Sequence, residues 1–135
     1  GAIRSLADRE LRVPLPVVHD GEVLNDPHHP YAGVYQGDED TNRKPAYHNG
    51  TAWTWPFPIF CEAWAEVFGE KSHVTCLAWL GSMKYLMRTG AAGFIPEILD
   101  GDIPHTPRGC DAQAWGVSEA ARVIHKLSAR RPLRS

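Results

Sequence analysis

Apolar residues recur at helical spacing in the second half of the chain and predict three helices. In the first, residues 59–68, apolar side chains stand at i, i+3, i+4, i+7 and i+8, which is one stripe along a helix. The stripe consists of Phe60, Ala63, Trp64, Val67 and Phe68. Gly69 then ends the helix. We expect the stripe, with Trp64 in it, to face the core.

A second helix is predicted from Ser72, which serves as its cap, to about Thr89, with Gly90 after its last turn. Its apolar face consists of Cys76, Trp79, Leu80, Met83, Leu86 and Met87. The connection between the two helices, from Gly69 to Lys71, is very short. The helices should therefore form an antiparallel hairpin.

A third helix is predicted from Asp111 to about Ser128. Its expected buried side consists of Ala114, Val117, Ser118, Ala121 and Ile124. Since helical periodicity dominates from Trp55 onwards, the chain is predicted to be mainly α.

The first third of the chain, residues 1–52, is rich in turn-forming residues. Its prolines are Pro14, Pro16, Pro27, Pro30 and Pro45. A short extended segment is expected at residues 1–6. About forty residues without regular structure are unusual in a compact domain and are normally functional or disordered. Because Tyr31, Val34 and Tyr35 could anchor the segment, we expect a long ordered loop.

The composition fits one folded domain with a core. The chain has 135 residues, of which 43% are hydrophobic and 22% charged, and this balance argues against intrinsic disorder. With 14 basic and 16 acidic side chains the net charge is −2, which gives no basic footprint for a nucleic-acid partner. No apolar run approaches the roughly 18 to 20 residues of a membrane-spanning helix, so we expect a soluble chain without a membrane partner.

The 3 cysteines, Cys61, Cys76 and Cys110, are far apart and form no C-x-x-C motif. A disulfide framework is therefore not expected. Cys61 and Cys76 fall within apolar helical patterns, where a free cysteine acts as a small core residue. This fits a reducing, cytoplasmic compartment, although one disulfide with one free thiol stays an alternative.

Aromatic and polar side chains alternate in residues 47–55, just before the first helix. Aromatic faces stack on the apolar faces of sugar rings, and His48, Asn49 and Thr51 could bind sugar hydroxyls. The alternative is that Trp53 and Trp55 are core anchors at the start of the helix. Composition favours the core role, so the stretch is a candidate sugar site only.

The loop of residues 93–110 is dense in polar groups. Glu97, Asp100 and Asp102 lie within six residues of one another, and His105 and Arg108 follow. One hypothesis is a carboxylate that acts as general base or nucleophile, with the arginine and a second carboxylate orienting it or binding substrate. The alternative is a solvated acidic turn before the helix cap.

Metal binding by this loop is weakly supported. Asp100 and Asp102 flank Gly101 as in a calcium loop, but no Gly-x5-Glu continuation follows. His105 with Cys110 suggests zinc, but two further ligands at suitable spacing are missing. We expect no metal and no other cofactor.

Four segments match ordered motifs of one enzyme family. Residues 47–55, YHNGTAWTW, are similar to Y-H-[QN]-G-T-V-W-P-W, and residues 97–102, EILDGD, to E-I-[FL]-D-G-D. Residues 104–115 match P-H-x-P-R-G-C-x-A-Q-A-W, and residues 1–7 are similar to G-[LIV]-R-[ST]-L-[AS]. The chain thereby resembles the C-terminal amylo-alpha-1,6-glucosidase region of the glycogen debranching enzymes.

The sequence departs from these motifs at three positions. Ala52 and Thr54 stand where Val and Pro are usual, and Gly116 stands where Ser is usual. None of these changes removes a charged group, so the resemblance still spans nearly the whole chain.

The resemblance implies an inverting glycoside hydrolase on an (alpha/alpha)6 barrel that removes the single glucose left on an alpha-1,6 branch of glycogen or a limit dextrin. An inverting enzyme holds a general acid and a general base roughly 6.5 to 9.5 Å apart. By resemblance, Glu97 is the general base. The residues implied to line the glucose-binding end are His48, Trp53, Trp55, Asp100, His105, Arg108 and Gln113.

The resemblance also implies that residues 1–135 form part of a larger domain. The barrel needs twelve helices, and the periodicity predicts three, so we expect the C-terminal portion of a barrel: a long loop region at 1–52, then a helical part at 53–135 with an active-site loop at 93–110. In the family, the general acid lies upstream of these motifs. Asp38, Glu39 and Glu62 are possible substitutes between which the sequence does not choose, so we expect the isolated chain to be inactive.

Other hypotheses remain open. The chain could be a non-catalytic module that binds alpha-glucan, or one that pairs with another subunit, with itself or with the upstream barrel segment. A hydrophobic rim left by missing helices would favour self-association. An unrelated helical domain with a chance match is the remaining alternative.

Overall fold

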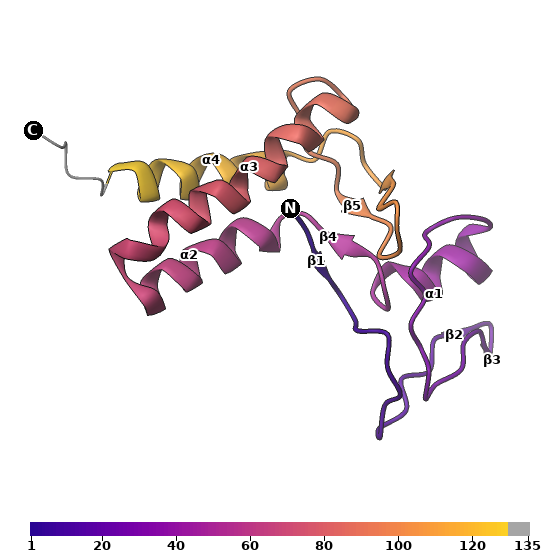
Figure 1. The fold of residues 1–135 in the computed structure, drawn as a ribbon. Helices are drawn as coiled ribbons and strands as arrows, with labels where there is room; N and C mark the ends of the chain where they lie inside the picture. The colour runs from indigo at the N-terminus through magenta and orange to yellow at the C-terminus, as the bar shows by residue number, and fades with distance from the viewer. Residues whose placement is uncertain (130–135) are drawn as a thin grey trace, which may run out of the picture.

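The computed structural model describes residues 1–129 and separates into a helical lobe and a loop lobe (Figure 1). The helical lobe consists of α2 (Pro56–Phe68), the short 3-10 helix η2 (Glu70–Ser72), α3 (His73–Thr89) and α4 (Ala114–Ala129). The loop lobe comprises residues 1–55 and 94–113. Its elements are β1 (Ile3–Arg4), β2 (Val18–His19), β3 (Glu22–Val23), the π-helix η1 (Glu39–Arg43), α1 (Lys44–Tyr47), β4 (Ala52–Trp53), β5 (Ile98–Leu99) and β6 (Pro107–Arg108). The prediction of a mainly α chain is confirmed in part, because small antiparallel sheets accompany the helices.

A four-stranded antiparallel sheet, in the order β1-β4-β5-β6, connects segments that are far apart in the sequence. Trp53 of β4 pairs with Ile3 on one side and with Ile98 on the other. Ile98 in turn pairs with Arg108 of β6. The sheet thereby places residues 47–55, which we call the aromatic stretch, beside residues 93–110, which we call the acidic loop. The extended segment predicted for residues 1–6 is confirmed by β1.

The N-terminal third contains more regular structure than the long loop that we predicted. β2 and β3 form a hairpin, and η1 leads directly into α1. The side chain of Asp38 caps η1 by accepting hydrogen bonds from two backbone N–H groups. Tyr31 and Tyr35 are partly buried, but Val34 is 47% exposed, so its predicted role as an anchor is wrong.

The three predicted helices are confirmed, and α2 and α3 lie side by side as a hairpin (Figure 1). α2 starts at Pro56, where the fixed φ of proline favours a first helical turn. Gly69 ends it with a φ of 72°. Ser72 occupies the N-cap position of α3 as predicted, but its side chain makes no capping hydrogen bond, and its hydroxyl donates to the carbonyl of Gly69. Within residues 1–129, no helix has both the length and the apolarity that crossing a membrane requires.

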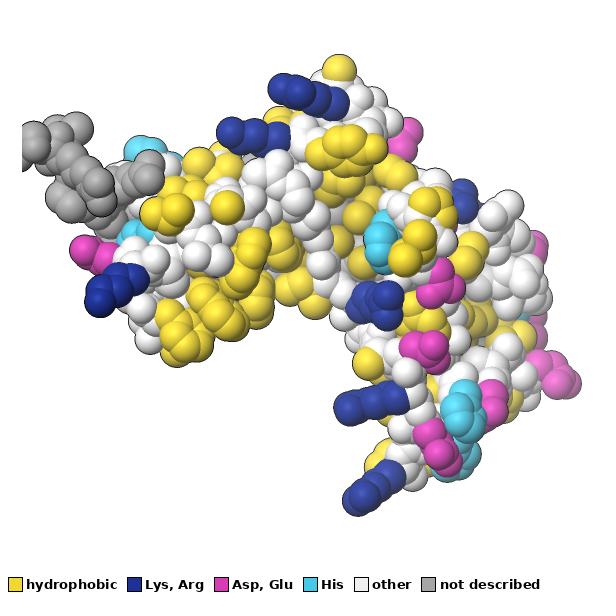
Figure 2. Space-filling view, in the orientation of Figure 1, with side chains coloured by type: hydrophobic (Ala, Val, Ile, Leu, Met, Phe, Trp, Pro, Cys, Tyr) yellow, Lys and Arg dark blue, Asp and Glu magenta, His cyan; other side chains and the backbone are white. Residues whose placement is uncertain are grey.

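The buried face of α2 is not the predicted stripe. Cys61 and Ala65 are 0% and 3% exposed, whereas Phe60 and Phe68 are 42% and 57% exposed. α2 packs against both α3 and α4, and its small side chains let the neighbouring helices approach closely. The aromatic side chains of the predicted stripe stack along the outside of the hairpin and reach Trp79. Figure 2 shows this apolar surface along the helical lobe.

α4 begins at Ala114 instead of Asp111, and its buried face is also shifted from the prediction. The buried residues are Gly116, Ala120, Val123 and Leu127. The predicted Val117 and Ile124 are partly buried, and the predicted Ala114, Ser118 and Ala121 are exposed. The reason lies at Gly116, where an added Cβ would lie 3.1 Å from Oγ1 of Thr54. The missing side chain lets α4 approach the loop lobe along this face.

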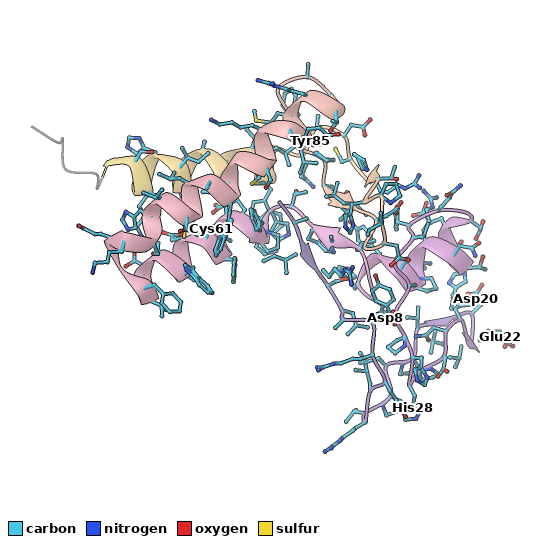
Figure 3. All side chains as sticks on the ribbon, viewed as in Figure 1. Asp8, Asp20, Glu22, His28, Cys61 and Tyr85 are labelled. Atoms are coloured by element: carbon cyan, nitrogen blue, oxygen red, sulfur yellow. The ribbon has the colours of Figure 1, made fainter. Side chains whose placement is uncertain are left out.

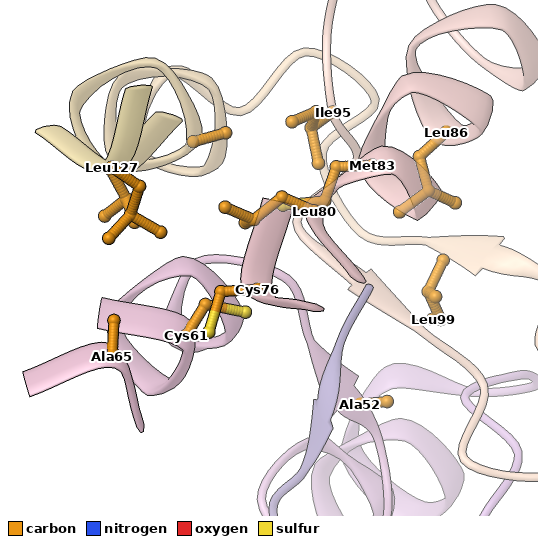
Figure 4. Close-up of a cluster of buried hydrophobic side chains, with 12 residues drawn as sticks. Ala52, Cys61, Ala65, Cys76, Leu80, Met83, Leu86, Ile95, Leu99 and Leu127 are labelled. Carbon is orange, nitrogen blue, oxygen red and sulfur yellow. The ribbon is translucent and has the colours of Figure 1, made fainter. Parts of the chain in front are cut away.

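The core lies between the three long helices and extends to the sheet (Figure 4). Leu80 and Met83 of α3 lie at its centre, and Leu99 joins it from β5. Cys61 and Cys76 lie next to each other in this core as free thiols. Burial raises the pKa of the Cys61 thiol to about 11.

Candidate functional site

Both carboxylate oxygens of Glu97 accept hydrogen bonds. The Tyr47 hydroxyl donates to Oε1 at 2.6 Å, and the Cys110 N–H donates to Oε2 at 3.1 Å. The backbone of Glu97 is fixed as well, because its N–H donates to the Cys110 carbonyl at 2.9 Å and its carbonyl accepts from the Thr54 N–H at 3.2 Å. Two separate segments, the stretch of residues 47–55 and the end of the loop at Cys110, therefore hold this one residue.

Two neighbours preserve this arrangement. Gly109 has a φ of 71°, and an added Cβ there would lie 2.5 Å from Oε2 of Glu97, so a side chain would displace the carboxylate. Burial, followed by the hydrogen bond to Glu97, raises the pKa of Tyr47 to about 12. The tyrosine therefore remains a hydrogen-bond donor at neutral pH.

Aromatic rings surround Tyr47. The centroid of its ring lies 4.9 Å from that of Trp53 and 5.5 Å from that of Tyr35. The indole Nε1 of Trp53 donates to the Tyr47 carbonyl at 3.2 Å. His48 lies parallel to Trp53 with centroids 5.3 Å apart. Trp53 thus helps to position the tyrosine that holds Glu97.

Asp100 follows β5 directly and is paired with Arg108 across the sheet. Asp100 is 4% exposed, and Nε and Nη2 of Arg108 both lie 3.0 Å from its Oδ2. The backbone N–H of Tyr35 donates to Oδ1 at 2.8 Å. A buried carboxylate needs such partners. Since the arginine is only partly buried, its other donors can face a ligand.

Close glycine contacts attach the N-terminal segment to the acidic loop. Gly33 packs against the carboxylate of Asp102, and Gly101 packs against the carbonyl of Gly50, so that a Cβ at either glycine would overlap these atoms. The Tyr31 hydroxyl donates to Oδ1 of Asp102 at 2.7 Å. Burial and this hydrogen bond raise the pKa of Tyr31 to about 12.

Three open pockets lie in a row around Tyr47. The first, of about 340 Å³, is lined in part by Tyr35 and Arg108. The second, of about 320 Å³, is lined by Tyr35, Tyr47 and His48 among others. The third, of about 390 Å³, includes His48 and Trp55. Neighbouring pockets share one lining residue, Tyr35 and then His48, and we call the row of three pockets the groove.

Two further predicted residues, His105 and Gln113, lie within the acidic loop and just beyond it, respectively. His105 is exposed, and its Nδ1 lies 3.0 Å from the carbonyl of Asp100. Gln113 is partly buried just before α4, where its N–H donates to the Ile95 carbonyl at 3.1 Å. Trp53 and Arg108, in contrast, lie on the strands that pair with Ile98, the residue after Glu97.

The possible second carboxylates differ in their surroundings. Asp38 caps η1. Glu39 lines the same pocket as Tyr47, whereas Glu62 forms ion pairs with Arg122 and Lys126 of α4. In the part of the chain that the structure describes, no group of three or more His, Cys, Asp or Glu side chains is arranged to hold a metal ion.

Residues 3–122, which include this entire constellation, match the family model described as amylo-alpha-1,6-glucosidase. The chain belongs to this family. The match confirms the resemblance drawn from the motifs. Neither a search of curated proteins nor a search of solved structures gives a match.

Membership of the amylo-alpha-1,6-glucosidase family does not by itself identify the groups that hold the site, and sequence reasoning missed several. Tyr47 was available as the first residue of the aromatic motif, but its contact with Glu97, 50 residues away, depends on the pairing of β4 with β5. Trp115 was available in the AQAW motif, and its ring stacks on Trp55 with centroids 4.1 Å apart.

Proposed function

We propose that this chain carries the general base of an inverting alpha-1,6-glucosidase that removes the single glucose left at a branch point of a limit dextrin. In this mechanism Glu97 accepts a proton from the water that attacks the anomeric carbon, while a general acid protonates the leaving oxygen. The observation that carries the proposal is the pair of hydrogen bonds to the Glu97 carboxylate in a chain of this family.

These hydrogen bonds support a base more than an acid. An O–H group and an N–H group both donate to the carboxyl oxygens of Glu97, and an ionised carboxylate accepts at both oxygens. A general acid must instead carry a proton on one of them. Since Tyr47 remains protonated, with a pKa of about 12, its donor persists over the working range of a glucosidase.

The groove beside Tyr47 supports a role in sugar binding. We assign sugar contacts to His48 and Trp53, whose rings line it, and to donors of Arg108, which Asp100 holds in place. Aromatic faces suit the apolar faces of sugars, and the polar groups suit their hydroxyls. His105, Trp55 and Gln113 complete the proposed substrate-binding set.

We propose that α2, α3 and α4 are part of an (alpha/alpha)6 barrel, with residues 93–110 as its active-site loop. The support is the exposed aromatic face of α2 and α3, including Phe60 and Phe68, which is the kind of surface that neighbouring helices cover. In this arrangement the general acid comes from another part of the barrel. The isolated 135-residue chain is then inactive. The two buried free thiols in the core fit a cytoplasmic enzyme.

The test measures free glucose released from phosphorylase limit dextrin. The isolated chain is expected to release none, and a longer protein that contains it is expected to lose at least 1000-fold in turnover with Glu97→Gln. Glu22→Gln is the control, because this carboxylate is exposed at the tip of the β2–β3 hairpin (Figure 3). Near-normal turnover of the Glu97→Gln protein would refute the assignment of Glu97 as the base. Multiple turnovers by the isolated chain would refute the proposal that the general acid comes from outside this chain.

A second candidate function is non-catalytic glucan binding. It is favoured by the surroundings of Glu62, which is paired with two cations and so is a poor proton donor. Binding of limit dextrin by a longer protein that never releases glucose would support this candidate over hydrolysis.

A further inference from the structure

The third pocket of the groove, which we call the aromatic pocket, differs from the site of Glu97. Its volume is about 390 Å³, and Glu97 is not among its lining residues. The lining residues that matter here are Arg4, Ser5, His48, Trp53, Trp55 and Trp115. They come from β1 and the residue after it, from the aromatic stretch and from the first turn of α4, so the pocket forms where the two lobes meet.

The tryptophans of the aromatic pocket are not equally available to a ligand. Trp53 is covered by His48, whose ring lies within 3° of parallel to it, and Tyr47 packs against it edge-on. Trp55 is stacked on Trp115 with an angle of 8° between the rings. Trp115 itself is 50% exposed. Trp55 therefore covers one face of the Trp115 indole, and the other face is available to a ligand.

The polar part of the pocket suits a neutral ligand rich in hydroxyls. No carboxylate is present among the lining residues, and the charged group is the guanidinium of Arg4. This guanidinium lies 5.7 Å from the centroid of the Tyr31 ring, which helps to orient it. An apolar platform with a few convergent polar groups is the usual form of a small-molecule site.

We propose that the aromatic pocket is a second sugar-binding site, which holds glucan residues beyond the glucose that is hydrolysed, with Trp115 as its stacking platform. This inference rests on the proposed function. The pocket shares His48 with the pocket that contains Tyr47, and Tyr47 holds Glu97. A glucan chain along the groove would thus place one end near the base and further residues on Trp115. Trp55 then supports the platform from behind.

The test measures the affinity of the 135-residue chain for maltoheptaose by titration calorimetry. Trp115→Ala is expected to weaken binding about tenfold, because it removes the stacking face, whereas Trp115→Phe should stay within about threefold of the original affinity. Tyr85→Ala is the matched control, since this aromatic residue is 69% exposed on α3 and does not line the aromatic pocket. It should leave the affinity unchanged.

A second measurement needs no substitution. Oxidation of tryptophans by N-bromosuccinimide, located by mass spectrometry, should slow at least threefold at Trp115 when maltoheptaose is present, with Trp64 of the helical hairpin as the internal reference. The inference is overturned if maltoheptaose gives no protection of Trp115, if the chain does not bind maltoheptaose, or if a folded Trp115→Ala chain binds it as before.

The two proposals fail in different ways. Glu97→Gln should leave maltoheptaose affinity within twofold, because Glu97 does not line the aromatic pocket. Loss of glucose release with retained binding supports both proposals. Retained release in Glu97→Gln with weakened binding in Trp115→Ala overturns the base assignment and leaves the sugar site standing.

Discussion

The helical lobe and the loop lobe are held together by different interactions. Buried apolar side chains from three helices form the core of the helical lobe, with Leu80 and Met83 at its centre. The loop lobe has two-residue strands, and its segments are joined by hydrogen bonds such as that from Tyr47 to Glu97 and by glycine contacts such as that of Gly101 with Gly50. Acidic side chains gather over the loop lobe in Figure 2. The lobe with the proposed chemistry is thus the one whose geometry depends on single polar contacts.

Gly101→Ala is expected to have the largest effect and to act on the loop lobe. The added methyl group would overlap the backbone carbonyl of Gly50, which cannot move without disturbing β4. We expect a loss of about 3 to 5 kcal/mol in the free energy of unfolding. Urea denaturation followed by circular dichroism measures it.

Gly81→Ala provides the matched control in the helical lobe. Gly81 lies within α3, and nothing lies within 4 Å of an added Cβ. Alanine is the better helix former, so this chain should gain about 0.5 to 1 kcal/mol. If the two variants changed stability equally, the contrast between the lobes would be wrong.

The same contrast explains how much of the fold could be predicted from the sequence. The helices followed from apolar periodicity, and so did the buried face of α3, which includes the predicted Cys76, Leu80, Met83 and Leu86. The buried faces of α2 and α4 did not, and α2 carries apolar residues on both sides. Small residues such as Cys61 and Gly116 decide which side packs, since they permit close approach. Periodicity weighs large side chains more heavily and therefore selected the aromatic stripe.

The candidate site was predicted differently. Motif resemblance selected Glu97 and its neighbours, whereas the contacts that hold it come from pairing between distant segments. Tyr47 reaches Glu97 only because β4 lies beside β5. Likewise, the partner of Asp102 is Tyr31, 71 residues away. The pattern of neighbouring residues in the sequence does not show which distant segments pair. These supporting residues therefore could not be assigned from the sequence.

A smaller effect is expected in the helical lobe at acidic pH. Glu62 of α2 accepts hydrogen bonds from Arg122 and Lys126 of α4, and these bonds lower its pKa to about 2 from an ordinary 4.5. A depressed pKa stabilises the fold above pH 4.5, and the contribution is lost as the pH falls towards 2. After allowance for solvent screening of the cations, Glu62→Gln should cost about 1 to 2 kcal/mol at pH 7.

Denaturation of both chains between pH 7 and pH 2 measures this contribution. The difference between Glu62→Gln and the unsubstituted chain should shrink to near zero at the acid end. Glu119→Gln is the control, because Glu119 pairs with Arg122 within α4 only and should cost below about 0.5 kcal/mol. A difference that stayed constant with pH would show that the ion pairs between the helices do not contribute.

The smallest effect is expected in the loop lobe at alkaline pH, from Tyr47→Phe. The pKa of Tyr47 is raised from 10 to about 12, mainly by burial and then by its bond to Glu97, so the fold favours the protonated phenol. This contribution, about 1 kcal/mol, is present below pH 10 and is lost as the pH rises towards 12. The stability difference between Tyr47→Phe and the unsubstituted chain should therefore narrow between pH 10 and pH 12. Tyr85→Phe, at an exposed position of α3, is the control. Acidic pH would then weaken the helical lobe, and alkaline pH would weaken the loop lobe. If the stability difference for Tyr85→Phe narrowed as much as that for Tyr47→Phe, the pH-sensitive hydrogen bond could not be assigned to Tyr47 and Glu97.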